Sequence, residues 1–385
     1  MSDDLILKNA RVVTPTEVVA GSVHLRDGLI ADIQTGPINS PSAIDLEGDY
    51  LIPGLVDLHT DNVERHIRPR RDADWPMLAA LMAHDAEMAA VGITTVFDAL
   101  YVGQRNIDPQ SSGTLELAIA ALNAGRKKKV FRAEHFLHLR AETSREAMPE
   151  IFASVYPEAS VRLISVMDHT PGQRQFANRQ GNGGQYGGGG RRRDRGSAEE
   201  IASGPDMSAE ERQEKIAASN RANLLSMLSG HSIALANHDD TTIEHVEQAY
   251  AEGISIAEFP TSVIAAQTAR DKGMKIVAGS PNLVIGRSLS GNVAVEELGR
   301  LGLLDVLASD YVPASLLHGA FLLSEKIGIP LPEAIGMVTL NPAQLTGLND
   351  RGCIAHGKRA DLVRVRMEEG LPVPTIVWRE GMRVC

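Results

Sequence analysis

Eight strand-like runs alternate with helix-like segments between residue 55 and about residue 342, and this alternation constrains the fold more than any other feature. Such a pattern is typical of parallel α/β folds, and eight units favour a closed (β/α)8 barrel over an open sheet. The expected strands are residues 55–59, 93–98, 131–141, 161–168, 233–238, 254–259, 275–279 and 305–310. The expected helices are residues 76–90, 113–125, 144–154, 209–229, 242–252, 263–272, 293–301, 313–327 and 331–339.

Both ends of the chain are rich in short strand-like runs. The N-terminal region has three of them, and an Asp27-Gly28 pair between the last two is a hairpin signal. The C-terminal region has an alternating run at 360–366 and further strand-like sequence at 375–384. We therefore expect a small β-sandwich built from residues 1–54 and 350–385, beside a barrel domain of residues 55–349.

One segment interrupts the alternation after the fourth expected strand. Residues 181–197 read GNGGQYGGGGRRRDRGS, which is too rich in glycine and charge to bury a core. We expect a Gly/Arg-rich insertion at about residues 177–207. Two interpretations remain open: a solvated linker, or a lid whose guanidinium groups reach a polyphosphate. The arginines concerned are Arg191, Arg192, Arg193 and Arg195.

Composition excludes several classes of protein. The net charge of -11 argues against general nucleic-acid binding. No apolar run reaches the roughly 18 residues of a membrane helix, and Asp3 and Asp4 stand where a signal peptide would be basic. The two cysteines, Cys353 and Cys385, form no metal-type cluster, as is usual in a reducing compartment. We expect a cytoplasmic protein with neither nucleic-acid nor membrane partners, and a homodimer is compatible with the sequence.

The run LIPGLVDLHTD at residues 51–61 predicts a buried strand that ends on two good metal ligands, His59 and Asp61. Side chains two positions apart on a strand point to the same side. An imidazole and a carboxylate therefore emerge together at the carboxyl end of a strand, where barrel enzymes build their active sites. Taken alone, the pair also fits an ordinary polar strand end, because two ligands do not make a metal site.

Most of the other expected strands also end in histidine or carboxylate residues. These residues are His135, His138, Glu142, Asp168, His169, His238, Asp239, Asp240, Glu258 and Asp310. Buried charges are costly unless they are paired or bound to metal, so the whole set predicts a shared cation. Singly, His135 or His138 fits a core histidine, Asp239 fits a helix cap before Thr242, and Glu258 fits an ion pair.

Nitrogen and oxygen ligands without cysteine fit zinc, manganese or iron. Such an ion lowers the pKa of bound water and supplies a hydroxide nucleophile at neutral pH. Asp310, after the last expected strand, suits the base that orients this water and takes its proton. The alternative for Asp310 is a cap of the helix expected near residue 313.

Several runs also resemble the amidohydrolase superfamily: PGLVDLH at 53–59, NPA at 341–343 and GKRADLV at 357–363. Within it, the sequence is most similar to the phosphonate-metabolism diphosphatases of the PhnM type. The similar runs are LHTDNVERH at 58–66, GITTVFDAL at 92–100, HFLHLRAE at 135–142, MDHTPGQRQF at 167–176, NHDD at 237–240, EFP at 258–260 and SDYVPA at 309–314. The resemblance implies a TIM barrel of the amidohydrolase type with a β-sandwich from both termini.

The resemblance also implies an activity, a cofactor and roles for residues. The implied reaction cleaves alpha-D-ribose 1-methylphosphonate 5-triphosphate to the 5-phosphate and pyrophosphate, with one or two divalent ions, zinc before manganese or iron. The implied metal ligands are His59, Asp61, Glu142, His169 and His238, with Asp310 as the catalytic residue. The expected substrate-binding residues are Arg65, His66, Arg68, Arg140, Arg174 and Glu258. The Gly/Arg-rich insertion departs from the family pattern.

Two rival functions stay open at this point. The same barrel and metal serve amide substrates, so an N-acetyl (deacetylase-type) or cyclic-amide hydrolase is the first rival, which a substrate screen would separate. The second is a barrel without catalysis that acts as a scaffold, which would contain no stoichiometric metal. The runs at 66–70 and 168–176 fit a phosphate-rich small molecule better than an amide, and the nearly complete set of ligands argues against a scaffold.

Overall fold

A computed structural model describes residues 4–70, 73–103, 114–156, 158–170, 174, 209–288 and 290–385 of the chain. One of its two eight-stranded sheets has all its strands parallel and in sequence order. They are β6 (Leu55–Thr60), β7 (Ile93–Val102), β8 (Glu134–Glu142), β9 (Val161–Met167), β10 (Ala234–His238), β11 (Ile256–Glu258), β12 (Lys275–Gly279) and β13 (Val306–Ala308). All eight expected barrel strands are confirmed, with their ends displaced by a few residues.

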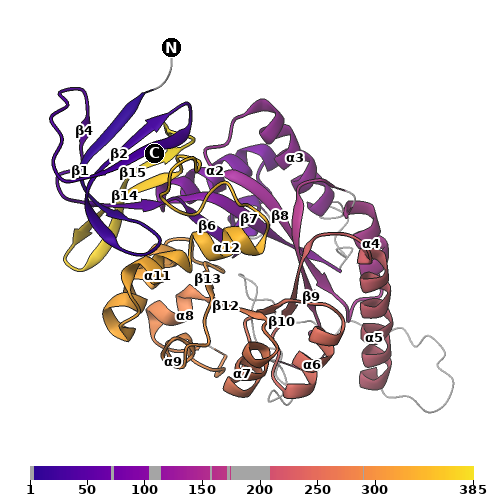
Figure 1. Ribbon diagram of the computed structural model, residues 1–385. Helices are drawn as coiled ribbons and strands as arrows, with labels where there is room; N and C mark the ends of the chain where they lie inside the picture. Colours follow the sequence, from indigo (N-terminus) through magenta and orange to yellow (C-terminus); the bar gives the residue numbers. More distant parts are fainter. Residues whose placement is uncertain are drawn as a thin grey trace.

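The sheet curls into a barrel whose first and last strands meet (Figure 1). Thr60 and Asp310 form a parallel bridge. The amide of Asp61 donates to the carbonyl of Asp310 at 2.8 Å, and the amide of Asp310 donates to the carbonyl of His59 at 2.9 Å. The barrel therefore closes at the residues predicted to be functional.

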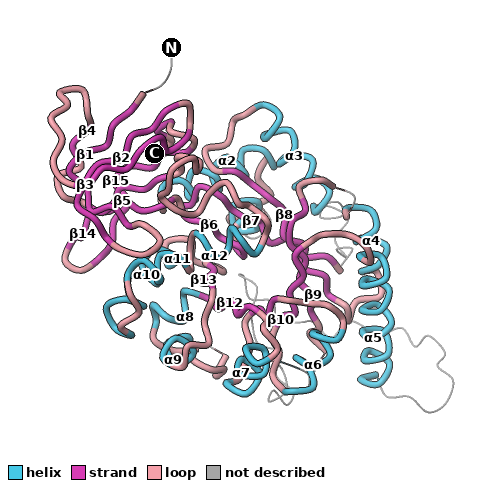
Figure 2. The backbone as a smooth tube through the Cα atoms, viewed as in Figure 1, coloured by secondary structure: helices cyan, strands magenta, loops and turns pink. Residues whose placement is uncertain are grey.

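Helices surround the strands, as the tube view makes clear (Figure 2). The expected helices are found as α2 (Met77–Ala90), α3 (Thr114–Lys128), α4 (Met148–Val155), α5 (Ala209–Leu228), α6 (Ile243–Ala251), α7 (Val263–Asp271), α9 (Val295–Arg300), α10 (Ser315–Leu322) and α11 (Leu331–Gly336). The segment after α10 continues as a π-helical turn, Leu323–Ile327. Three short helices were not predicted: α1 (Val63–Ile67), α8 (Ser280–Ile285) and α12 (Leu340–Leu345). The predicted insertion at about 177–207 lies outside the described residues.

A second, mixed sheet draws its strands from both ends of the chain. Its strands are β1 (Leu5–Val13), β2 (Val18–Arg26), β3 (Leu29–Thr35), β4 (Ile44–Asp45), β5 (Tyr50–Pro53), β14 (Leu362–Glu368), β15 (Leu371–Arg379) and β16 (Met382–Arg383). Strand β5 lies between N-terminal β1 and C-terminal β14, so the two ends are joined by backbone hydrogen bonds. The prediction of one β module from both termini is confirmed.

This module is one continuous sheet that curls back on itself. The amide of Ile30 donates to the carbonyl of Lys358, and the amide of Ala360 donates to the carbonyl of Gly28. The curled sheet encloses its own core, in which Trp378 is the largest buried side chain. A separate core fills the barrel interior, with Phe97 and other apolar side chains from successive strands.

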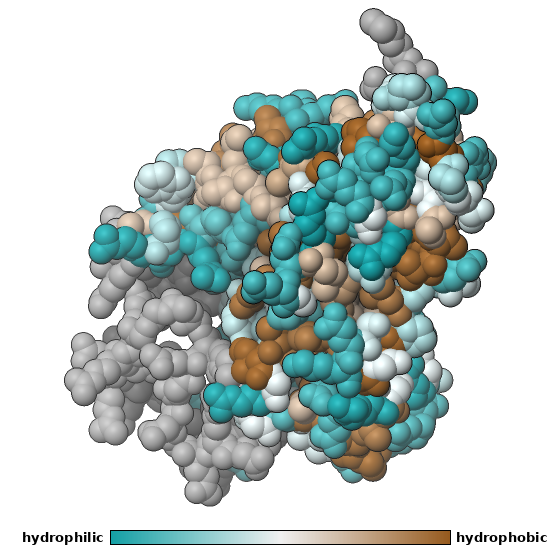
Figure 3. Space-filling model, turned by 90° about the vertical axis from the view of Figure 1, so that its left-hand side faces the viewer, coloured by the Kyte–Doolittle hydropathy of each residue, from teal (hydrophilic) through white to brown (hydrophobic). Residues whose placement is uncertain are grey.

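The molecular surface carries both apolar and hydrophilic side chains. In the face drawn in Figure 3, apolar side chains form small groups separated by hydrophilic ones. Within the described part of the chain, no helix is long and apolar enough to cross a membrane.

Candidate active site

The first group of candidate ligands lies at the seam of the barrel. His59 is near the end of β6, Asp61 follows that strand, and Asp310 lies two residues beyond β13. One donor atom from each of the three lies within 4.8 Å of the others. His59 is fully buried, whereas the Asp61 side chain is 34% exposed, so this group opens to solvent. The seam therefore brings the predicted catalytic residue to two predicted metal ligands.

The second group lies at the ends of the strands opposite. His169 follows β9, His238 ends β10, and Asp239 comes next, and donor atoms of these three also lie within 4.8 Å of one another. Glu142, the last residue of β8, places Oε2 2.7 Å from Nδ1 of His169. The rings of His59 and His238 are 5.9 Å apart, so the two groups adjoin. We call the seven residues together the mouth cluster: His59, Asp61, Glu142, His169, His238, Asp239 and Asp310.

Unsatisfied polar atoms distinguish this cluster from ordinary buried polar residues. Four of its residues have buried side-chain atoms for which the described residues offer no hydrogen-bond partner: His59 Nε2, Glu142 Oε2, both ring nitrogens of His238, and Asp239 Oδ2. A buried polar atom without a partner costs about 1–3 kcal/mol, so five such atoms in one place need an explanation. Imidazole nitrogens and carboxylate oxygens that converge without partners fit a divalent cation.

A shell of hydrogen bonds orients these donors. Nδ1 of His59 lies 2.9 Å from Oε1 of Glu258, and because an ionised carboxylate can only accept, Nδ1 donates this bond and fixes the orientation of the ring. The hydroxyl of Ser165 donates to the other oxygen of Glu258 at 2.6 Å. Glu258 was predicted among the substrate-binding residues, and the structure places it 1% exposed beneath His59. Neither the role of Glu258 in orienting His59 nor that of Ser165 follows from their positions in the sequence.

Glu142 is held in the same way. The hydroxyl of Ser144 donates to Oε1 at 2.6 Å, and the amide of His169 donates to the same oxygen at 3.0 Å. Burial opposes the charged form of Glu142, but His169 and Ser144 overcome it and lower its pKa to about 2. One oxygen is therefore fixed by protein donors, and Oε2 is directed toward His169.

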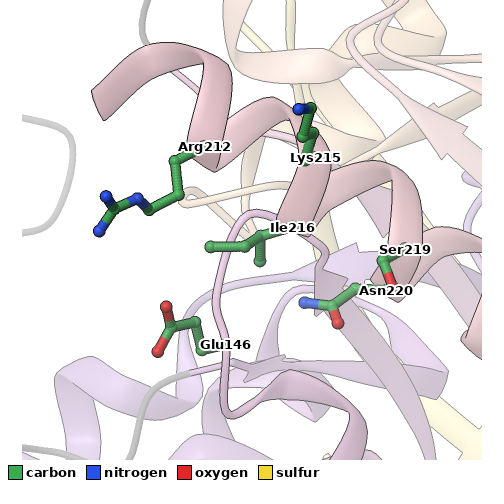
Figure 4. A pocket seen from close by; sticks show the side chains of 6 residues that line it. All are labelled: Glu146, Arg212, Lys215, Ile216, Ser219 and Asn220. Carbon is green, nitrogen blue, oxygen red and sulfur yellow. The ribbon is translucent and has the colours of Figure 1, made fainter. Parts of the chain in front are cut away.

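The loop that carries Ser144 is tied to helix α5. Nδ2 of Asn220 donates to the carbonyls of Thr143 and Arg145, both at 2.9 Å. Asn220 also lies at one end of a groove between α5 and this loop (Figure 4). The residues lining the groove are Glu146, Arg212, Lys215, Ile216, Ser219 and Asn220. The groove contains none of the predicted site residues, so it lies on the outer side of the loop.

Asp310 has the properties of a base near neutral pH. Burial and the neighbouring Asp61 carboxylate raise the pKa of Asp310 to about 6. Its φ of +53° places a non-glycine residue in the left-handed region, which is uncommon and concentrates at functional sites. A carboxylate with this pKa is largely ionised at pH 7 and still accepts a proton.

Two predicted substrate-binding arginines lie at the mouth cluster. Nη1 of Arg140 contacts both carboxylate oxygens of Asp61, at 2.7 and 2.8 Å. Arg174 donates to Asp240 at 2.6 Å and to the carbonyl of His238 at 3.1 Å, and it is 6% exposed. Arg140 thus borders the open side of the cluster, and Arg174 supports the end of β10 from behind.

The remaining three basic residues lie on or next to α1. Arg65 is exposed and donates to the carbonyl of Tyr311, directly after Asp310. Nε2 of His66 is 2.8 Å from Glu87 on α2, and Nε of Arg68 is 2.7 Å from Asp74. The structure therefore brings Arg65 to the rim of the site, while His66 and Arg68 contact carboxylates outside the mouth cluster.

A second set of buried imidazoles and carboxylates lies between the barrel wall and α2. It consists of His84, Asp98 and His135, and we call it the wall cluster. Asp98 is 2.8 Å from a ring nitrogen of each histidine. His135 was considered both as a ligand and as a core histidine, and its contacts are those of a hydrogen-bonded core histidine.

Comparisons with known proteins agree with this architecture. A profile of the Amidohydrolase family matches residues 216–374. The solved 5-methylcytosine deaminase from Klebsiella pneumoniae has a TM-score of 0.68 at 15% identity and covers 99% of this chain and 98% of its own. N-acetylglucosamine-6-phosphate deacetylase from Pasteurella multocida has a TM-score of 0.62, also at 15% identity, over 99% of both chains. At such identities, the two structures show the fold alone.

The alpha-D-ribose 1-methylphosphonate 5-triphosphate diphosphatase of Escherichia coli (strain K12) is 42% identical over 99% of this chain and 100% of its own length. The fold and the mouth cluster, together with the profile match, define a metal-dependent hydrolase of the amidohydrolase superfamily. Within that superfamily, the chain belongs to the family of the E. coli diphosphatase.

Proposed function

We propose that this protein hydrolyses alpha-D-ribose 1-methylphosphonate 5-triphosphate to the 5-phosphate and pyrophosphate in phosphonate catabolism. The observation that carries the proposal is the 42% identity to the E. coli diphosphatase over essentially the whole of both chains. The match to a dihydroorotase of Methanopyrus kandleri, by contrast, is 38% identical over 18% of this chain. The dihydroorotase therefore shares a segment of this sequence, whereas the diphosphatase aligns with essentially all of it.

We propose that His59, Asp61, Glu142, His169 and His238 hold the divalent cation. The partnerless atoms of His59, Glu142 and His238 support this assignment. Zinc is the ion that we favour, with manganese and iron as alternatives, because the donors are nitrogen and oxygen without sulfur. When bound, the ion supplies Lewis acidity and makes hydroxide available at neutral pH.

The protein's own residues would then carry out three tasks. Asp310 accepts the proton of the attacking water, for which its pKa of about 6 is suited. The water oxygen forms a bond to the phosphorus on the ribose 5-oxygen, and the bond from that phosphorus to the oxygen of the departing pyrophosphate breaks. Arg140 and Arg65 stabilise the negative charge on the phosphoryl oxygens. Glu258 fixes the orientation of the His59 ring.

We assign the outer basic residues to the distal phosphates of the triphosphate. His66 and Arg68 lie on or next to α1, beyond Arg65, and each is paired with a carboxylate in this structure. Arg174 supports His238 through its carbonyl and is too buried to meet substrate without rearrangement. The substrate would therefore lie with its reacting phosphorus at the mouth cluster and its terminal phosphates toward α1.

Pyrophosphate release from the ribosyl triphosphate tests the proposal directly. Metal-loaded protein is expected to release pyrophosphate, and Asp310→Asn should lower kcat by about 10²–10⁴-fold, because general-base catalysis contributes that much. N-acetylglucosamine 6-phosphate and dihydroorotate serve as counter-substrates under the same conditions. Hydrolysis of either amide without pyrophosphate release would replace the proposal by its amide-hydrolase rival.

A further inference from the structure

Phe259 is an aromatic residue at the mouth of the barrel that the tasks assigned so far leave unused. It follows Glu258, the last residue of β11, and it is partly buried against the apolar core that fills the barrel. Its ring centroid lies 5.0 Å from that of His59 and 5.3 Å from that of His238. The ring therefore lies between the barrel core and the mouth cluster.

The backbone of Phe259 has the conformation that turns two other side chains to the mouth. Its φ is +54°, against +62° for Asp239 and +53° for Asp310, and all three residues follow the ends of barrel strands. This left-handed region is unfavourable for a bulky residue, whereas glycine or asparagine adopts it readily. Because Asp239 and Asp310 both belong to the mouth cluster, the turn at Phe259 brings an apolar ring to the same place.

A small open space adjoins this ring at the end of β12. Gly279, the last residue of that strand, has a φ of -79°, which residues with side chains also adopt, so its backbone does not require glycine. A Cβ atom on Gly279 would lie 3.8 Å from Oδ2 of Asp310 and 3.9 Å from Cε1 of Phe259. Outside its chain neighbours, no described atom would lie nearer. The missing side chain thus leaves room for at least a methyl-sized group between the proposed base and the ring.

The order of the strands places this space on the side of Asp310 that faces away from α1. Strand β13, which precedes Asp310, pairs with β12, whereas Asp310 itself bridges to Thr60 of β6. Helix α1, to which we assign the terminal phosphates, follows β6. The ribose, which is the other large substituent of the reacting phosphorus, then extends toward β12 and β11.

An aromatic ring suits a sugar better than it suits a phosphate group. The face of the ring carries partial negative charge, which attracts the weakly positive C–H groups of a sugar and repels phosphate oxygens. Small-molecule sites are commonly lined by aromatic side chains, with a few polar groups that fix orientation. The ring of Phe259 therefore fits the uncharged part of the proposed substrate.

We propose that Phe259 and Gly279 form a subsite for the ribose of the substrate. The ring of Phe259 packs against the C–H face of the sugar, and the absent side chain of Gly279 provides the room beside Asp310. This inference rests on the proposed diphosphatase function and adds to it two residues that select the sugar.

Calorimetric binding of two matched probes to the metal-loaded protein tests the inference. The first probe is methyl riboside 5-triphosphate with a methylene group in place of the oxygen between the first and second phosphorus atoms, so the bond that the proposed reaction breaks is absent. The second is methyl triphosphate with the same replacement, which has the same phosphate chain and no sugar. The ratio of the two dissociation constants measures the contribution of the ribose alone.

Gly279→Ala adds one methyl group to the open space, and its contacts of 3.8 and 3.9 Å leave the fold undisturbed. We expect the riboside probe to bind about 10-fold more weakly, as is usual when a fitted site is overpacked, and methyl triphosphate to bind as before. Gly336→Ala on α11 is the matched control, because the nearest described atom to its Cβ is Oδ1 of Asn341 at 3.9 Å. It should leave both dissociation constants unchanged.

Phe259→Leu keeps an apolar side chain and removes the aromatic face. We expect it to lower the preference for the riboside probe about fivefold. Metal content per chain is measured on each variant and should equal that of the wild type, because neither residue offers a ligand atom. Should Phe259→Leu disturb the neighbouring histidines and lose metal, Gly279→Ala decides the test alone.

Equal affinity of the wild type for the two probes would overturn the inference. So would an unchanged ratio in Gly279→Ala, including an equal loss of affinity for both probes. The proposed reaction fails by a different measurement. Wild-type protein that prefers the riboside probe and releases no pyrophosphate from the ribosyl triphosphate would remove the reaction and leave the ribose subsite standing.

Discussion

The mouth cluster and the wall cluster contain the same kinds of residue and behave differently. In the wall cluster, and in each of the two triads of the mouth cluster, imidazole and carboxylate donors lie within 4.8 Å of one another. In the wall cluster, Asp98 bonds His84 and His135, and the free nitrogens of the two rings contact Asn62 at 3.4 Å and Asp85 at 3.3 Å. In the mouth cluster, by contrast, five buried atoms find no hydrogen-bond partner among the described residues.

The comparison teaches that hydrogen bonding between the side chains, and not their residue type, distinguishes a binding site from a structural hydrogen-bond network. The wall cluster is fully buried, and its polar groups satisfy one another, so it stabilises the packing of α2 on β7 and β8. The mouth cluster is held in place by Glu258, Ser144 and Asn220, which leaves the donors themselves unsatisfied. We propose that a bound cation satisfies these donors.

The largest expected effect on stability comes from breaking the wall cluster. Asp98→Ala removes the acceptor of two buried ring nitrogens, and removing one partner from a buried charged pair costs about 3–5 kcal/mol. We expect thermal unfolding to occur at a clearly lower temperature, while the number of ions bound per chain stays at the wild-type value. Calorimetry and metal analysis of the same sample measure both. Loss of metal from a folded Asp98→Ala protein would show that the two clusters are not separate.

A smaller effect is expected at the mouth cluster, where the change is in cation affinity and not in stability. Ser144→Ala removes one of the donors that fix Glu142. We expect cation affinity to fall by about 10–100-fold, as is typical when a group that orients a ligand is lost, with little change in the unfolding temperature of the metal-free protein. Competition with a chromogenic chelator gives the affinity. Ser154→Ala, whose hydroxyl bonds the carbonyl of Ile151 within α4, should leave it unchanged.

The smallest effect is a pH dependence of the wall cluster. Burial disfavours the charged form of His135, but Asp98 and Asp85 outweigh it and raise its pKa to about 9. Because the folded-state pKa lies above the unfolded value of about 6.5, this stabilisation is complete below pH 6.5 and is lost as the pH rises toward 9. The difference in unfolding temperature between wild type and His135→Asn should therefore shrink over that range. A constant difference from pH 6 to 9 would contradict a charged His135.

The sequence predicted the strands of the barrel because each is a compact apolar run that ends in polar residues. It did not predict α1, α8 and α12, whose five or six residues show little amphipathic pattern. The equally short α9 and α11 were found only within longer helices expected at 293–301 and 331–339. The curled terminal sheet was predicted as a module, but its closure depends on hydrogen bonds between residues that are distant in sequence, such as Ile30 and Lys358.

The outline of the candidate site could also be predicted, from the residues at the strand ends. Ligands at strand ends are visible in the sequence, because strand ends converge in a barrel. Which of them remain unpaired depends on neighbours from other strands, and the sequence does not show this. His135 is the second residue of β8, near its amino end, and bonds Asp98 and Asp85 in the wall, whereas His169 follows the carboxyl end of β9 and faces Glu142 and Asp239 at the mouth.

The closure of the barrel through Asp61 and Asp310 has a consequence for biosynthesis. These residues flank the earliest and latest strands of the barrel to be translated, so a nascent chain lacks the proposed base until Asp310 has left the ribosome. Strand β14 must then pair with β5, which was made long before. Assembly of the site is therefore completed only in the nearly finished polypeptide, and a ribosome that stalls earlier would leave a chain with a gap where its first and last barrel strands should join.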